Sequence, residues 1–407
     1  MNKWTRLSSF ESRIGAGLVD NECDFFVPRA GKMSRLTDFP RNITPGDPLC
    51  QYKLRYEFPT RRRIRLYSIG MATQKELAKL AGVSAGTVSN VISGSARVSE
   101  RYRQKVLNAV RALNYQPNLI ARSLKTNRTR ALGIVVPDIT IPFFPKIVRG
   151  AESAARERGY FLIVLDSEHN HTREVDMMAL LHSQRVEGIL LVAAGGPERS
   201  GGSAAISGPP VVYLDRLPQG VKGDSVSVDD RTSAEMGVSH LLARGHTHIA
   251  IITGPLTLKN EQERLRGYRQ ALYKSGIPVD ESLIWAGSFD RDVVARICHR
   301  GLFKPGSRPS ALFATNGVTG LEALRSIYAA GLQTPRDIAF VTFDELTTDD
   351  FFHPGITCVV QPTFDIGYRA VEVLLDRIER GRGNGPLYKI RLPATLMVRE
   401  SSNQAVT

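Results

Sequence analysis

The sequence predicts an α/β protein in which a small all-α helix-turn-helix headpiece precedes a larger, two-lobed core of doubly wound parallel sheets. Three observations predict it. Residues 71–92 space their apolar side chains as two short helices around a tight turn. Positive charge is concentrated before residue 131. From residue 131 onward, buried-strand patterns alternate with helical ones, which is typical of repeated βα units.

The segment 71–92 has the pattern of two helices that share one small core. Thr73 and Glu76 have the spacing of a capping box, which marks the start of the first helix. Gly82 stands where the chain must reverse, and Ser84 can cap the second helix. The apolar positions expected to meet are Leu77, Ala78, Ala81, Val83, Val88 and Val91. An ordinary helical hairpin shows the same periodicity, so this pattern alone leaves that alternative open.

The charge distribution favours DNA binding over a plain hairpin. Residues 71–130 contain eleven Lys and Arg side chains against two Glu, whereas the whole chain carries a net charge of +14. The 277 residues that follow hold 30 basic and 31 acidic side chains. A compact basic segment beside a near-neutral body indicates nucleic-acid binding, because each phosphate contact releases counterions.

The segment after the turn extends this pattern toward a known family. A third amphipathic helix is predicted from Arg101 to Leu113, then a turn at 114–118 and a short helical piece at 119–124. The run from Met71 through Leu124, with AGVS-x-x-TVS, VSE, LNYQPN and ARSL, resembles the headpiece and hinge of the lactose-repressor (LacI) family of bacterial transcription regulators. The resemblance implies a hinge helix that folds when two subunits meet on operator DNA. It also implies that Leu124 wedges into the minor groove; plain linker packing is the alternative for this leucine.

The second helix is expected to enter the major groove with its first turns. Ala85 can touch only a thymine methyl, Gly86 reads no base directly, and Asn90 can pair with adenine or reach a phosphate. The operator sequence is therefore not readable from this chain. The expected DNA-contacting residues are Thr73, Ser84, Ala85, Gly86, Thr87, Ser89, Asn90, Asn118, Ala121, Arg122 and Leu124.

The core is expected to contain two similar lobes around a cleft. Strands are predicted at 131–136, 161–165, 188–192, 211–214, 249–252, 311–314 and 338–341, and helices at 143–158, 172–184 and 233–244. The resemblance, which covers 71–400, implies a periplasmic-binding-protein-like core that binds an effector and dimerises. The expected domains are the extension 1–70, the headpiece 71–118, the hinge 119–130, the core 131–400 and the tail 401–407. Within the core, the first lobe is expected to combine 131–230 with 361–388, and the second 231–360 with 389–400.

The candidate effector-binding residues follow strands, where ligands bind in parallel sheets. Asp138 follows the first strand, Asp215 and Arg216 the fourth, and Asn316 and Asp344 two later ones. Arg264 is expected to open a helix. The resemblance implies effector contacts at positions matching Phe143, Phe144, Arg264, Phe289, Asn316 and Asp344. Gly317 stands where the family usually has Asp, which bears on the loop geometry and the type of effector.

These residues also have plainer interpretations. Asp138 fits a helix cap, Asp215 with Arg216 a local ion pair, and the two phenylalanines, Phe143 and Phe144, fit core packing. Carboxylate, guanidinium and amide groups can nevertheless each take two hydroxyls of a polyol, while aromatic rings stack on its apolar face. The sequence therefore favours a sugar or sugar derivative as effector.

Other chemistry has little support in the sequence. The pairs His169/His171 and His246/His248 have i, i+2 spacing, but no cysteine or second cluster accompanies either, so no metal is expected. No nucleophile elbow, acid pair or cofactor fingerprint appears, so neither an enzyme nor a cofactor is expected. Four scattered cysteines, no apolar span and no signal-peptide region favour a cytoplasmic protein without a membrane partner.

Residues 1–70 mix isolated prolines with arginine runs and show no sustained periodicity. We interpret them as a disordered basic arm or as upstream sequence wrongly read as protein; an additional phosphate-binding arm is the functional alternative. For the chain as a whole, the sequence predicts an effector-controlled repressor that binds operator DNA as a homodimer or a higher oligomer. A periplasmic-type sugar-binding protein and a corepressor-dependent regulator of nucleotide metabolism are the alternatives. The effector, the target genes and the direction of its effect stay open.

Overall fold

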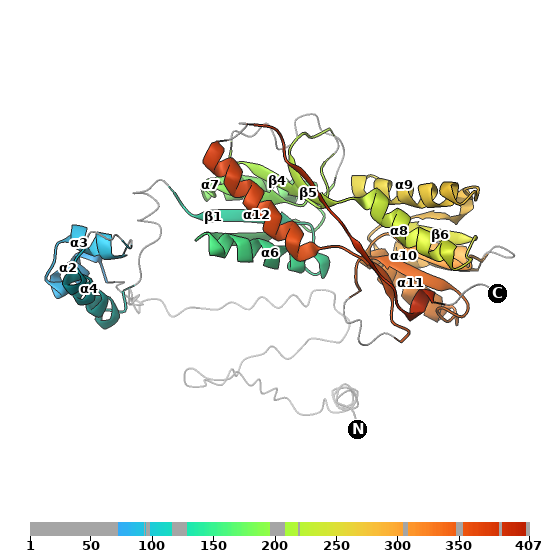
Figure 1. The fold of residues 1–407 in the computed structure, drawn as a ribbon, viewed down its shortest axis with the longest axis horizontal. Helices are drawn as coiled ribbons and strands as arrows, with labels where there is room; N and C mark the ends of the chain where they lie inside the picture. The colour runs from blue at the N-terminus through green and yellow to red at the C-terminus, as the bar shows by residue number, and fades with distance from the viewer. Residues whose placement is uncertain are drawn as a thin grey trace, which may run out of the picture. The chain divides into compact units, whose positions relative to one another are not determined.

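The computed structural model describes residues 72–92, 94, 98–115, 128–195, 208–218, 220–303, 308–346, 353–381 and 385–403. The chain divides into two compact units, Met1–Gly70 and Met71–Thr407, and the described residues all belong to the second. Figure 1 shows the helices and strands of that unit. The expectations for residues 1–70, Asn118, Ala121, Arg122 and Leu124 concern positions outside the described residues.

Three helices form the headpiece: α2 (Gln74–Ala81), α3 (Ala85–Ile92) and α4 (Glu100–Ala112). The predicted capping box is present, since the Thr73 amide donates to Glu76 Oε2 at 2.6 Å and the Glu76 amide donates to Thr73 Oγ1 at 3.3 Å. Gly82 ends α2 with φ 63°, a left-handed conformation that suits glycine at a tight turn. The apolar residues predicted to meet do form one cluster, which Val106 and Ala109 of α4 complete.

The first lobe of the core contains a six-stranded sheet in the order β11-β5-β4-β3-β1-β2, with every pair parallel. Its strands are β1 (Ala131–Val136), β2 (Phe161–Asp166), β3 (Gly188–Leu191), β4 (Val211–Leu214), β5 (Asp224–Val228) and β11 (Lys389–Leu392). Its helices are α6 (Phe143–Glu157), α7 (His171–Ser183) and α12 (Thr363–Arg380).

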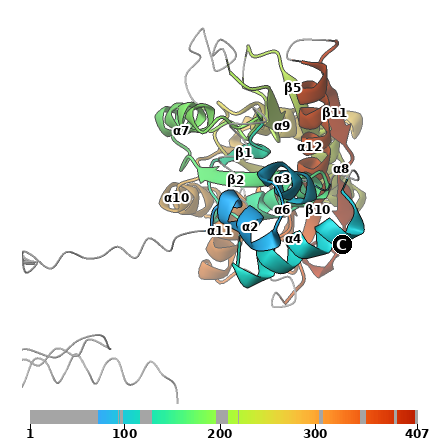
Figure 2. The same ribbon diagram turned by 90° about the vertical axis from the view of Figure 1, so that its left-hand side faces the viewer.

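Helices cover both faces of this sheet. Ile134 of β1 packs in the cluster that contains α6 and α12, whereas its neighbour Val135 packs with α7 residues. Because successive side chains of a strand point to opposite faces, α7 lies across the sheet from α6 and α12. Figure 2 shows α7 and α12 on opposite sides of the strands. A Cβ at Gly367 of α12 would lie 2.0 Å from the Ile147 carbonyl oxygen, so α6 and α12 touch backbone to backbone.

The second lobe repeats the arrangement, with the strand order β12-β10-β9-β8-β6-β7. Its strands are β6 (Ile249–Thr253), β7 (Ile284–Ala286), β8 (Ala311–Ala314), β9 (Ala339–Phe343), β10 (Thr357–Val360) and β12 (Thr395–Met397). Its helices are α8 (Asp230–Ala243), α9 (Lys259–Lys274), α10 (Arg291–Leu302) and α11 (Gly317–Ala329), with the short turns η2 (Glu281–Leu283) and η4 (Glu400–Ser402). The predicted α/β class, with a helical headpiece and two sheet domains, is confirmed.

One strand departs from the predicted parallel sheets. β12 runs antiparallel to β10, at the edge of the second sheet. The chain passes from β11 to β12 through only two residues, without the crossover helix that would return it to the parallel direction. Figure 1 shows this segment, in dark red, running from the first sheet to the second.

Two predicted boundaries at the end of the core are wrong. Residues 389–392 were expected in the second lobe, but β11 pairs with β5 along its whole length and belongs to the first. Residues 401–407 were expected to be a tail, yet Ser401 and Ser402 are fully buried. Ser401 Oγ donates to the Phe340 carbonyl at 2.6 Å and accepts the Thr357 amide at 2.9 Å, so the second lobe continues through η4.

Candidate functional site

The start of α3 presents an exposed polar surface on the headpiece. The Thr87 amide donates to Ser84 Oγ at 3.1 Å, so Ser84 caps the helix as predicted. Val88 and Val91 face the core, whereas Ser84, Ala85, Gly86 and Asn90 are exposed. Thr73 is also exposed, and Thr87 and Ser89 are partly buried. The face predicted to read DNA is therefore the face that the headpiece core leaves open.

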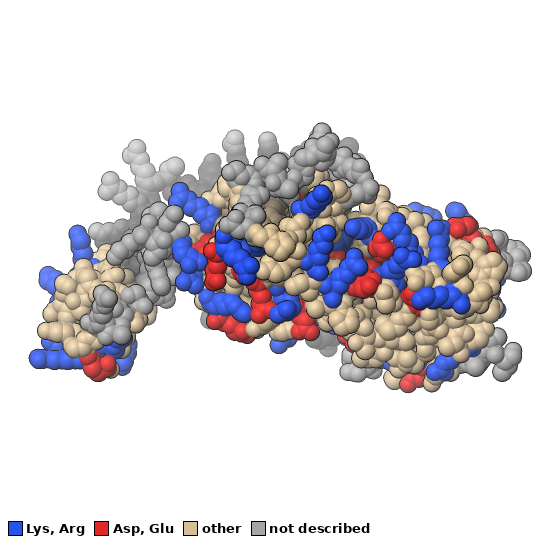
Figure 3. Space-filling model, turned by 45° about the horizontal axis from the view of Figure 1, so that its top comes forward, with Lys and Arg blue, Asp and Glu red and all other residues tan. Residues whose placement is uncertain are grey.

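Charge on the headpiece agrees with an anionic partner. In the view of Figure 3 its surface shows Lys and Arg at several points and little acidic surface, whereas basic and acidic side chains are interspersed over the core. The basic residues Lys75, Lys79 and Arg101 are exposed. A headpiece with exposed basic side chains and an open helix start suits contact with a phosphate backbone.

A second site lies between the two lobes, where loops that follow parallel strands converge. His169 follows β2, Asp215 follows β4, and Asp344 follows β9. All three have left-handed backbones, with φ of 54°, 60° and 70°. Such conformations are costly for residues with side chains and cluster where a structure must aim a functional group.

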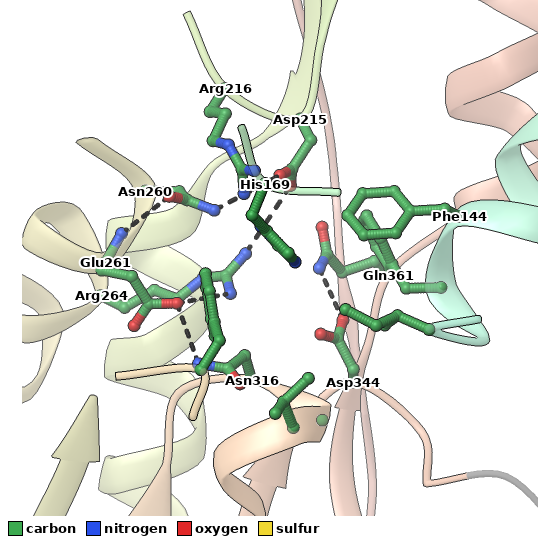
Figure 4. A pocket seen from close by; sticks show the side chains of 15 residues that line it. Phe144, His169, Asp215, Arg216, Asn260, Glu261, Arg264, Asn316, Asp344 and Gln361 are labelled. Carbon is green, nitrogen blue, oxygen red and sulfur yellow. Dashed lines mark hydrogen bonds and ion pairs between the residues drawn. The ribbon is translucent and has the colours of Figure 1, made fainter. Parts of the chain in front are cut away.

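The pocket at this point has about 410 Å³ of empty space, part of it open to solvent. Figure 4 shows its side chains converging from both lobes. Eight predicted residues line it: Phe143, Phe144, Asp215, Arg216, Arg264, Phe289, Asn316 and Asp344. The ninth, Asp138, is not in the lining. Its carboxylate accepts the amide and the hydroxyl of Thr140 at 2.8 and 2.6 Å, and so fixes the turn before α6.

Arg264 lies at the centre of the buried charges. It is in the second turn of α9, not at the helix start as predicted, because α9 begins at Lys259. Its Nε donates to Asp230 Oδ1 at 2.8 Å, its Nη1 donates to the Thr315 carbonyl at 2.7 Å, and its guanidinium lies 3.8 Å from the centre of the Phe343 ring. Burial alone would lower the pKa of this guanidinium, but the carboxylates of Asp230 and Glu261 outweigh it and raise the pKa.

Burial changes the acids and bases around the pocket. It raises the pKa of Asp344 to about 6, against the opposing effect of Arg264. It also lowers the pKa of Arg216, whose Nε donates to the Ala193 carbonyl at 2.6 Å. Asp215 Oδ2 lies 3.5 Å from Arg216 Nη1, so the local ion pair considered from the sequence exists inside the pocket.

Glu261 holds the polar floor of the pocket in place. It is 1% exposed, and its carboxylate accepts the Gly254 amide at 2.9 Å, the Asn316 side-chain amide at 3.1 Å and the Thr315 hydroxyl. Asn316 Oδ1 in turn accepts the Thr319 amide at 2.9 Å and caps α11. Both ends of the Asn316 amide are therefore engaged within the protein.

Three polar atoms of the pocket are buried without a hydrogen-bond partner among the described residues: Arg216 Nη2, Arg264 Nη2 and Gln361 Oε1. Arg264 Nη2 lies 2.8 Å from Asp230 Oδ1, but without hydrogen-bond geometry. Gln361 Nε2 donates to Asp344 Oδ1 at 2.6 Å, which fixes the orientation of the amide. Because buried polar groups are normally satisfied, the unpaired donor of Arg216 and acceptor of Gln361, beside an Arg264 Nη2 that has only an ion pair, indicate a ligand in this pocket.

Sequence reasoning missed four polar residues of the lining: His169, Asn260, Glu261 and Gln361. His169 carried a usable signal, since it follows a predicted strand as Asp215 does, but it was considered only as a metal ligand. Within the described part of the chain, no group of three His, Cys, Asp or Glu residues is arranged to hold a metal. The described helices also include none that is both long and apolar enough to cross a membrane.

Comparisons with known proteins agree with both sites. Residues 73–118 match the family model described as bacterial regulatory proteins, lacI family, and residues 238–402 match the periplasmic binding protein-like domain. The chain is 35% identical over 311 residues to the ribose operon repressor of Escherichia coli K12, covering 76% of this chain and 93% of that protein. It is 33% identical, also over 311 residues, to the transcriptional repressor PurR of Aliivibrio fischeri, covering 76% and 92%.

Solved structures show the same likeness. The complex of the transcriptional regulator CelR with cellobiose aligns with a TM-score of 0.62 and 33% identity, covering 81% of this chain and 99% of that one. The lac repressor dimer bound to operator and the anti-inducer ONPF aligns with a TM-score of 0.71 and 26% identity, covering 81% and 98%. The chain therefore belongs to the lacI family of bacterial regulatory proteins, with a DNA-binding headpiece joined to an effector-binding core.

Proposed function

We propose that this chain represses transcription as a homodimer on operator DNA, and that a sugar or sugar derivative bound between the lobes releases it. The observation that carries the proposal is the set of buried pocket atoms without a hydrogen bond, Arg216 Nη2, Arg264 Nη2 and Gln361 Oε1. A hydroxyl group both donates and accepts hydrogen bonds, so a polyol satisfies all three. The relatives named for ribose and for a cellobiose complex are consistent with this ligand class.

Each pocket residue then has a distinct role. Arg216 Nη2 and Arg264 Nη2 donate to ligand oxygens, while Gln361 Oε1 and the carboxylates of Asp215 and Asp344 accept from ligand hydroxyls. The rings of Phe144 and Phe289 offer apolar faces to the carbon skeleton. Asn316 and Glu261 mainly position their neighbours, because their own polar atoms already have partners.

The headpiece supplies specificity for the operator. The hydroxyls of Ser84, Thr87 and Ser89 and the amide of Asn90 are the polar groups of α3 that face bases or phosphates, with Ala85 and Gly86 permitting close approach. One headpiece reads one half-site, so tight specific binding requires two. The proposed contacts of Thr73, Asn118, Ala121, Arg122 and Leu124 rest on the family resemblance.

Coupling between the sites follows from the position of the pocket. Its lining comes from both lobes, so a ligand that contacts both favours the arrangement in which they are closed. The ligand changes DNA binding only to the extent that it binds the closed arrangement more tightly than the open one. A coupling of about 1–3 kcal/mol corresponds to a change of roughly 5- to 150-fold in operator affinity.

The test is operator binding by the full chain, measured by fluorescence anisotropy on DNA from beside its own gene, with and without D-ribose, D-glucose and cellobiose. Release of the DNA by at least one of these sugars supports the proposal. Tighter binding with sugar would make the ligand a corepressor and reverse the proposed direction. Failure of every sugar both to bind, by calorimetry, and to shift operator affinity would refute a sugar effector.

A further inference from the structure

A second cavity adjoins the polar pocket between the lobes. It has about 840 Å³ of empty space, part of it open to solvent, and is lined from the first lobe by Ala194 and Gly195 and from the second by Thr257, Leu258 and Ser288. Two residues line both cavities, His169 and Phe289. Their ring centroids lie 5.1 Å apart with the planes tilted by 35°, so the two rings meet on the common boundary of the cavities.

His169 is held in this position by the backbone around it. Glu168 and His169 both have left-handed backbones, with φ of 50° and 54°. The carboxylate of Asp166 accepts the Glu168 amide at 2.8 Å and the Ile139 amide at 2.9 Å, while the His169 amide donates to the Pro137 carbonyl at 2.8 Å. These bonds fix an otherwise costly conformation, whose result is an imidazole aimed into the cleft.

Phe289 is held from the opposite lobe. A Cβ at Gly254 would lie 2.8 Å from the Phe289 ring, so the ring packs directly over the backbone of this glycine. Burial and the nearby Arg216 guanidinium lower the pKa of His169, which favours the neutral form of its ring. A neutral imidazole can stack against a phenyl ring without bringing a second positive charge beside Arg216.

We propose that His169, in contact with Phe289, determines the size of the effector by separating the polar pocket from the second cavity. This inference rests on the proposed function. The polar pocket takes one sugar ring, and the ring pair closes its outer side. Without the imidazole the two cavities join, and a second sugar ring extends past Phe289.

The second cavity has the chemistry that a second sugar ring needs. Thr257 and Ser288 provide hydroxyls, and Asp290 also lines the cavity, with its carboxylate capping α10. Leu258 and Pro255 add apolar surface. A disaccharide is therefore the ligand expected to gain most from the joined space, because its second ring finds hydrogen-bond partners and an apolar contact together.

The test compares sugar binding by the full wild-type chain and the variant His169→Gly, using calorimetry with D-ribose, D-glucose and cellobiose. Glycine accepts the left-handed backbone, so this variant removes the ring without adding strain. We expect the wild type to bind a single-ring sugar in preference to cellobiose. His169→Gly should shift that preference toward cellobiose by about tenfold or more. Phe289→Ala should shift it in the same direction.

The matched control is His171→Ala, two residues along the chain and outside both cavities, which should keep wild-type selectivity. Single-ring binding by the wild type with unchanged selectivity in both His169→Gly and Phe289→Ala would overturn this inference alone. Cellobiose binding by the wild type at single-ring affinity would overturn it as well. A wild-type chain that binds none of the three sugars refutes the sugar effector, and this inference with it.

Discussion

Asp230, the first residue of α8, accepts the Nε of Arg264, in the second turn of α9, at 2.8 Å. Both side chains are buried, and Arg264 is only 2% exposed. Asp230 does not line the pocket, whereas Arg264 does. The carboxylate therefore sets the direction of the guanidinium from behind, at the point where the chain enters the second lobe after β5.

This pair makes stability depend on pH. Burial raises the pKa of Asp230 from 3.8 to about 7, against the opposing charge of Arg264. Between these values the folded chain binds a proton that the unfolded chain does not, so the free energy of unfolding falls as pH rises from about 4 to about 7. Urea unfolding at several pH values should show this slope in the wild type and a shallower one in Asp230→Asn. The exposed control Asp292→Asn should keep the wild-type slope; equal slopes in all three proteins would contradict the assignment.

The ligand response should depend on Arg264 and Asp344. Arg264→Ala and Asp344→Ala remove groups that face the pocket, so both variants should bind operator DNA normally yet lose release by sugar. Arg266→Ala, an exposed neighbour on α9, is the matched control and should respond as the wild type does. Anisotropy titrations with and without sugar measure both properties. Normal responses in both pocket variants would show that the effector binds elsewhere.

Sugar affinity should fall in mild acid. Burial raises the pKa of Asp344 to about 6, so the carboxylate becomes protonated as pH falls through that value. A neutral carboxyl group accepts hydrogen bonds from hydroxyls less strongly than a carboxylate does. Calorimetry from pH 7.5 to 5.5 should therefore show weakening affinity in the wild type, and weak but nearly pH-independent affinity in Asp344→Asn. A wild-type affinity that is constant over this range would argue against the role of Asp344.

Gly86 offers a test of contact with DNA. It lies within α3, where glycine costs roughly 1 kcal/mol relative to alanine. A Cβ there would meet only Ser84 Oγ at 3.7 Å, so the headpiece has room for it. Gly86→Ala should increase protection of the α2–α4 amides in hydrogen exchange while weakening operator binding, if DNA approaches this backbone closely. Undiminished operator binding would remove Gly86 from the proposed contacts.

A protein that starts at Met71 should fold and bind operator as the full chain does. Residues from Met71 onward form a compact unit by themselves. Residues 1–70 show no periodicity that could build a core. The shorter protein and the full chain should be compared by solubility, by thermal unfolding and by fluorescence anisotropy on operator DNA. Loss of operator binding at physiological salt in the shorter protein would instead make the extension a phosphate-binding arm.

Local rules were sufficient for the headpiece and for half of the pocket. The capping box at Thr73, the turn at Gly82 and the cap at Ser84 involve residues three or four apart, so the sequence displays them directly. Asp215 and Asp344 were found because ligand groups follow parallel strands. The same rule, applied consistently, would have included His169.

The remaining features depend on contacts between distant segments. β11 has the short sequence KIRL, and its assignment to the first lobe follows only from pairing with β5, more than 160 residues earlier. From the sequence alone, Glu261 is one of several charged residues on a polar helix and would be expected on the surface. In the structure it is buried, because Gly254, Thr315 and Asn316 surround its carboxylate. Gln361 follows a strand that the sequence did not predict, so no local pattern placed it in the pocket.

The chain leaves the first lobe, builds the second and then returns to the first, and this order determines when a newly made chain can complete its fold. Ala370, Val371 and Leu374 of α12 are fully buried against the first sheet, yet they are synthesised after almost all of the second lobe. A ribosome needs about 10 to 30 s to translate from β5 to the end of α12. During this time the part of the first sheet that α12 covers stays exposed. The first lobe is then completed only by β11, near the carboxyl end of the chain. Premature termination between α12 and β11 therefore leaves both sheets without their last strands, even though the headpiece and every residue of the pocket lining have already been made.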